Sequence, residues 1–131
     1  MPIIATDTPR FSNLVKHEYE PTTGFCRESV TVNEATAATY AVGTVLGKVT
    51  ATGKYKVSKA GATDGSEVVA ALVLEDKTVA ATTDTKVLVM VRGQAIVSKA
   101  ALIFDATYDA AAKTTAYAVL EGKGILVNET I

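Results

Sequence analysis

Hydrophobic and polar residues alternate with a period of two most clearly between positions 44 and 57. The alternation runs over 44–50, stops at the pair Thr52 and Gly53, and resumes over 54–57. Gly53 can supply the positive φ that a tight hairpin turn needs. The pattern therefore predicts a β-hairpin that has one solvated face and one buried face.

Other stretches have the composition of strands, because β-branched and apolar residues dominate them. The stretch 67–74 is almost continuously apolar, which favours a strand buried on both faces, although periodicity alone does not separate it from a helix. Gly93 predicts a bulge or a turn between two of the strands. The strands that we expect outside the hairpin are 29–32, 67–74, 86–92, 94–97 and 124–127.

Two helical segments are expected near the C-terminal end. Ser98 can cap a short helical turn over 100–102, and Asp109 can cap a longer helix that runs to about Glu121. Apolar residues in the longer segment recur at helical spacing, which predicts one buried face. Gly122 is placed to end this helix in the left-handed conformation.

Residues 1–28 follow neither period, and prolines and Gly24 interrupt them. A short helical turn over 12–17 is the only regular element predicted there. The segment holds too many apolar residues for an inert linker, so we expect it to dock either on its own body or on a partner. We interpret 1–28 as an N-terminal arm and 29–131 as the body. The candidate contact residues of the arm are Phe11, Leu14, Val15, Tyr19 and Phe25.

Composition agrees with one domain that is mainly β, of the α+β class. A chain of 131 residues can bury a sizeable core, and with 48% hydrophobic residues, 6% aromatic residues and no Trp, that core must consist of aliphatic side chains. We therefore expect a compact β-sheet or barrel-like body with one or two short helices and an extended N-terminal arm.

Charge and hydropathy argue against several classes of partner. The net charge is -1, with 13 basic and 14 acidic residues spread along the chain, so direct nucleic-acid binding is not expected. No apolar run approaches the roughly 20 residues of a membrane-spanning helix. The N-terminus has no basic segment followed by a hydrophobic one, which predicts synthesis in the cytoplasm.

Candidate chemical groups are few. His17 has Glu18 and Glu20 beside it, but a metal site would need further ligands from elsewhere in the chain. Cys26 has only this histidine as a possible base partner, so both are interpreted as ordinary side chains. The stretch 64–67 does not have the spacing of a calcium loop and is interpreted as a turn. The carboxylate pairs 75–76 and 105/109 lie where acidic residues are common anyway. We expect no catalytic residue, no metal site, no cofactor and no enzymatic activity.

Several stretches, taken in order and spacing, resemble the head decoration protein family of tailed bacteriophages, the phage lambda type. No single motif is specific, and the resemblance covers about residues 18–128. Cys26 stands where the family more often has Ser, and the segment 33–42 is longer and richer in Ala and Thr than expected. The similar stretches are 24–28, 29–32, 43–55, 64–67, 72–76, 87–93 and 124–127.

The resemblance implies a structural protein of the virion. Members of this family assemble as trimers on the outside of the expanded head, at local three-fold positions, and stabilise it against the pressure of packaged DNA. The implied partners are the major capsid protein, which the arm would contact, and further copies of this chain. An alternative that remains open is another virion β-protein, such as a tail-tube or head-completion component.

Overall fold

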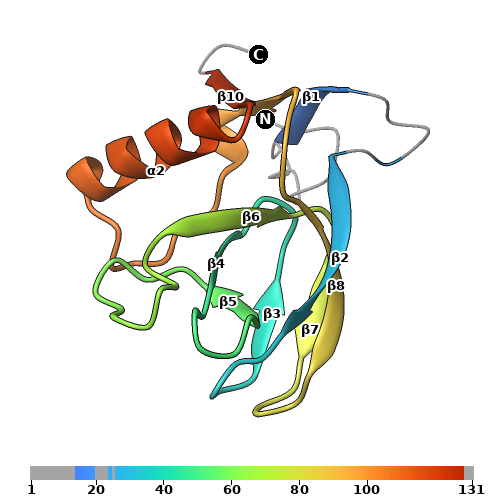
Figure 1. Cartoon of the computed structure of the whole chain (residues 1–131), viewed down its shortest axis with the longest axis vertical. Coiled ribbons are helices and arrows are strands. Elements are labelled where there is room, and N and C mark those ends of the chain that lie inside the picture. Colours follow the sequence, from blue (N-terminus) through green and yellow to red (C-terminus); the bar gives the residue numbers. More distant parts are fainter. Residues whose placement is uncertain (1–13, 20–23, 25, 129–131) are drawn as a thin grey trace, which may run out of the picture.

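A computed structural model describes residues 14–19, 24 and 26–128 of the chain (Figure 1). These residues are mostly strands, with one α-helix and one short 3₁₀ helix, as the expected fold class requires. In chain order the elements are β1 (Val15–Glu18), β2 (Arg27–Val32), β3 (Ala38–Tyr40), β4 (Val45–Lys48), β5 (Tyr55–Val57), β6 (Val69–Val73), β7 (Lys77–Val79), β8 (Thr85–Met90), β9 (Ala95–Ser98), η1 (Lys99–Ala101), α2 (Ala110–Gly122) and β10 (Ile125–Asn128).

Five strands form a closed barrel in the order β2-β5-β4-β6-β8. β2 and β8 are antiparallel over their whole length, and β2 meets β5 in a parallel pair at Val32 and Tyr55. The predicted hairpin is confirmed, since β4 and β5 are antiparallel and Gly53 between them has a φ of 71°. The barrel is therefore built around the stretch whose alternation is clearest in the sequence.

A three-stranded sheet in the order β1-β9-β10 lies beside α2 at one end of the molecule (Figure 1). β9 is its central strand, with β1 antiparallel on one side and β10 parallel on the other. The two ends of the described chain thus meet in one sheet. A separate pair of strands, β3 and β7, is antiparallel.

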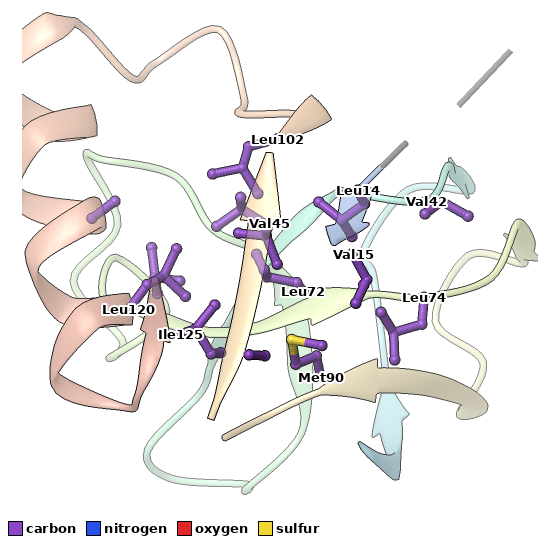
Figure 2. Packing of buried hydrophobic residues seen from close by; sticks show 14 of the residues in the cluster. Leu14, Val15, Val42, Val45, Leu72, Leu74, Met90, Leu102, Leu120 and Ile125 are labelled. Atoms are coloured by element: carbon purple, nitrogen blue, oxygen red, sulfur yellow. The ribbon is translucent and has the colours of Figure 1, made fainter. Parts of the chain in front are cut away.

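Buried apolar residues form two clusters. The barrel cluster combines residues of the barrel strands with Tyr40 of β3 and Val79 of β7. The interface cluster lies between the barrel strands β4, β6 and β8 and the elements β1, β9, α2 and β10; Figure 2 shows Leu14 and Val15 entering it from one side and Leu120 and Ile125 from the other. β6 contributes to both clusters, with Leu72 in the interface cluster and Val73 in the barrel cluster, so burial on both faces is confirmed.

The helix α2 begins as predicted, because the Asp109 carboxylate accepts a hydrogen bond from the backbone N–H of Ala112 at 2.8 Å. Its end differs from the prediction. Gly122 is still helical, and the glycine with positive φ is Gly124, at 87°. The short segment after Ser98 is a 3₁₀ helix in which the Ser98 side chain makes no capping hydrogen bond.

Two predictions about irregular segments were wrong. Residues 15–17, expected in a helical turn, are extended because they pair with β9, and this tertiary contact outweighs a weak local preference. The segments 33–42 and 75–85, which lie outside the expected strands, contain β3 and β7. Each of these strands has only three residues, too few for a period-two pattern to be recognised.

Candidate functional site

The structure separates the five candidate contact residues of the N-terminal segment. Phe11 and Phe25 lie outside the described residues. Leu14 and Val15 are buried in the interface cluster, so the chain itself covers them. Tyr19, directly after β1, leaves 44% of its surface exposed. Of the two ways in which the segment could be covered, docking on its own body therefore applies to Leu14 and Val15, and a capsid contact through the other residues stays a prediction.

Strand β1 binds the body through the backbone of β9. Val15 lies opposite Val97 and Glu18 opposite Ala95, with an irregularity in register between Val15 and His17. The backbone N–H of Tyr19 then donates to the carbonyl oxygen of Gln94 at 2.7 Å. Part of the segment interpreted as an arm is thus the edge strand of the β1-β9-β10 sheet.

An ion pair that the sequence does not suggest joins β1 to the barrel. Arg27, the first residue of β2, donates from Nε and from one terminal nitrogen to the two carboxylate oxygens of Glu18, both at 2.7 Å. The Glu18 side chain is only 4% exposed. This bidentate hydrogen bond raises the pKa of Arg27. Two charged residues nine positions apart carry no signal of pairing until β1 is known to be a strand.

Cys26 lies beside the same ion pair. Its buried thiol donates weakly to the carbonyl oxygens of Tyr19 at 3.6 Å and Gln94 at 3.7 Å. Burial raises the pKa of the thiol, although the hydrogen bond to Tyr19 and nearby arginines oppose the shift. A protonated, buried thiol is a poor nucleophile, so Cys26 has the properties of a structural side chain.

The remaining polar candidates also make local contacts. The Asp64 carboxylate accepts from the hydroxyl and the backbone N–H of Ser66, and these bonds lower the pKa of Asp64 to about 2. This geometry is that of a turn, as interpreted. His17 is exposed on β1. Across the part of the chain that the structure describes, no three His, Cys, Asp or Glu residues form a group that could hold a metal ion.

Large apolar side chains are exposed at a few points of the described surface. Two belong to the β1-β9-β10 sheet: Tyr19 beyond the end of β1, and Leu126, 45% exposed, on the edge strand β10. Val68 lies at a cavity of about 260 Å³ between α2 and the start of β6. None of the helices in residues 14–19, 24 and 26–128 has the length and apolar character needed to cross a membrane.

Comparison with known proteins identifies the kind of molecule to which this surface belongs. A search among curated proteins gives no match. The family model of bacteriophage lambda head decoration protein D matches residues 4–125, which include the N-terminal segment, the barrel, α2 and the first residue of β10. This is a family of structural phage proteins, so the match indicates a role in decorating the phage capsid. The chain belongs to the bacteriophage lambda head decoration protein D family.

Proposed function

We propose that this protein binds the outer surface of the expanded phage head as a homotrimer at local three-fold positions and stabilises the shell against the pressure of packaged DNA. Its partners are the major capsid protein and two further copies of itself. It acts without a cofactor, without direct contact to nucleic acid and without a membrane. The observation that carries the proposal is the family match over residues 4–125.

The stabilisation follows from mass action. A protein that binds only the expanded shell shifts the equilibrium toward that state by an amount that depends on its concentration relative to its dissociation constant. A trimer that contacts several capsid subunits also gains affinity, because its second and third contacts form at a high effective concentration. Neither effect requires catalysis, which agrees with a family of structural proteins.

The N-terminal segment is the proposed capsid-contact region. Residues 1–13 precede Leu14 and β1. The buried side chains of Leu14 and Val15 would anchor the segment to the body, while Tyr19 would contact the capsid protein together with Phe11 and Phe25. An extended segment of this kind can add a strand to a sheet edge of the capsid protein.

Cryo-electron microscopy tests the proposal directly. Expanded heads of the phage that encodes this chain, stripped of decoration and mixed with the purified protein, are expected to show trimeric density at every local three-fold position. Bare shells beside a protein that forms rings or tubes in light scattering would instead indicate the tail-tube or head-completion alternative.

Two variants test the contact region. Deletion of residues 2–13 should leave the body folded, because it stops before buried Leu14, and should abolish saturation of the heads. Tyr19→Ala should weaken binding more than Leu126→Ala, since both side chains are equally exposed but lie on opposite sides of β9. An equal or larger effect of Leu126→Ala would contradict the assignment of the N-terminal side of the sheet.

A further inference from the structure

Strand β1 is a short edge strand, and in its sheet it pairs with β9 alone. It has four residues, and its register against β9 is irregular between Val15 and His17. Leu14 and Val15 bury apolar surface at its beginning, whereas Lys16 and His17 are exposed. The second half of β1 buries no apolar side chain, and besides its backbone pairing with β9 it has one further interaction with the body.

That interaction is the ion pair between Glu18 and Arg27. Because Arg27 begins β2, which is paired with β8, the bond joins the end of β1 to the barrel rather than to its own sheet. The two parallel bonds of 2.7 Å fix both the distance and the orientation of the carboxylate, which a single lysine contact would not do.

The burial of this pair points to a positioning role. Removing a carboxylate from water is expensive, and a buried ion pair often stabilises a protein no better than apolar residues of the same size. What a bidentate pair adds is a single defined geometry. By contrast, Glu28, the residue after Arg27 on β2, forms an exposed pair at 3.3 Å with Arg92, of a kind that contributes little.

Further bonds define the same junction. The backbone N–H of Tyr19 donates to Gln94, and the Cys26 thiol lies between the carbonyl oxygens of both residues. The backbone N–H of Val91 donates to the carbonyl oxygen of Cys26 at 3.0 Å. The end of β1 and the start of β2 are therefore both bonded to the segment 91–94 that joins β8 to β9.

We infer that the Glu18–Arg27 pair is a latch that holds β1 on β9 and so fixes the position of the strand that follows the proposed capsid-contact residues. This inference rests on the proposed function. With the latch closed, the segment starts from a rigid anchor and less conformational freedom is lost when it binds. With the latch open, β1 separates from β9 and the same contacts form from a more mobile tether.

Hydrogen exchange tests the latch in the free protein. In Glu18→Gln, which keeps the shape but loses the charge, backbone amides shared between β1 and β9 should exchange about tenfold faster, while amides of β2 and β8 keep their protection. Arg27→Lys should have a similar effect, since lysine does not reproduce the bidentate geometry. Glu28→Gln, the matched control, should leave all of these rates unchanged. Unchanged exchange in Glu18→Gln would overturn the inference.

Binding to undecorated expanded heads tests the consequence. Glu18→Gln should bind about tenfold more weakly than the parent protein. Addition of His17→Cys and Ile96→Cys to this variant should restore the affinity when the two cysteines form a disulfide, and reduction of the disulfide should lower the affinity again. These positions are cross-strand partners in β1 and β9. If the disulfide does not restore the affinity, Glu18 acts in another way and the inference is wrong. Parental affinity in Glu18→Gln would also contradict the inference. Failure of the parent protein itself to bind heads refutes the proposed function instead, and the exchange rates still decide whether the latch exists.

Discussion

The barrel cluster and the interface cluster are buried to a similar degree but are assembled differently. The barrel cluster consists mainly of valines from strands between Val30 and Val89, so the middle of the chain supplies all of it. The interface cluster extends from Leu14 to Ile125 and contains larger or more flexible side chains such as Met90 and Leu120. One core is closed by a barrel, and the other is closed by the two ends of the described part of the chain.

The difference assigns separate tasks to the two regions. A closed barrel has no free strand edges, so it suits the rigid body that the proposed function requires. The interface cluster includes the edge strand β1, which pairs with β9 alone, whereas the parallel pairing of β9 with β10 does not involve β1. The segment proposed to contact the capsid therefore enters the molecule at its more separable region.

Truncation of one leucine in each cluster gives the largest expected effect. Leu46→Ala in the barrel cluster should lower the free energy of unfolding by about 3 kcal/mol, because the barrel cannot collapse around the cavity. Leu14→Ala should lower it by only about 1 kcal/mol, since β1 can separate locally instead. Both leucines are fully buried. Urea unfolding at a fixed protein concentration measures both, and equal losses would contradict the comparison.

The same difference explains which parts of the fold could be predicted. The hairpin, β6 and β8 each carry their pattern within one continuous stretch of sequence, so local alternation or a continuous apolar run was sufficient. β1 was mistaken for a helical turn because Phe11, Leu14 and Val15 have helical spacing, and only pairing with β9 makes the strand. β3 and β7 depend on each other in the same way.

The candidate site was predictable only in outline. Apolar residues in a proline-interrupted segment indicate that something must cover them, but the sequence does not say what. The structure shows that the chain covers Leu14 and Val15 itself. The Glu18–Arg27 pair could not be predicted at all, because it depends on three elements, β1, β2 and β9, being arranged correctly.

The next largest effect on stability is expected where an added side chain would collide with backbone atoms beside the barrel. A Cβ on Gly47 of β4 would lie 2.0 Å from the carbonyl oxygen of Ser66, so Gly47→Ala must move backbone and should cost about 2–3 kcal/mol. Gly122→Ala is the control, because its Cβ meets nothing within 4 Å and it should stabilise α2 by about 0.5 kcal/mol. Thermal unfolding compares the two. A tolerated Gly47→Ala would show that the barrel is less rigid than its closed topology suggests.

A smaller effect is expected where β3 joins the barrel cluster. The buried Tyr40 hydroxyl donates to the Glu34 carboxylate, which also accepts from the backbone N–H of Val57 at 2.8 Å. Tyr40→Phe should therefore cost about 1 kcal/mol at neutral pH. Chemical denaturation of the variant at pH 7 measures this loss, and an unchanged stability would mean that the bond contributes nothing.

The same tyrosine also predicts a dependence on pH. Burial, and next the bond to Glu34, raise the pKa of Tyr40, so the folded state holds this proton more tightly than the unfolded state does. The stabilisation is complete below about pH 10 and is lost as the pH rises further. Denaturation between pH 8 and pH 11 should show a shallower decline in Tyr40→Phe. Part of the slope should remain, because burial also raises the pKa of Tyr55.

The smallest effect is expected at the turn around the exposed residue Asp64, whose charge stabilises the turn. Ser66→Ala removes the hydroxyl that contributes most to lowering the pKa of Asp64 to about 2, so the pKa should rise toward its ordinary value. The stabilisation from the ionised Asp64 is present above about pH 4 and is lost as the pH falls through about 2. Carboxyl NMR titration of the variant, with Asp105 as an internal control, measures the change. Asp105 should titrate as before because its pKa is lowered by Thr107. An Asp64 pKa still near 2 would mean that the backbone N–H of Ser66 and the side chain of Lys56 suffice to lower it.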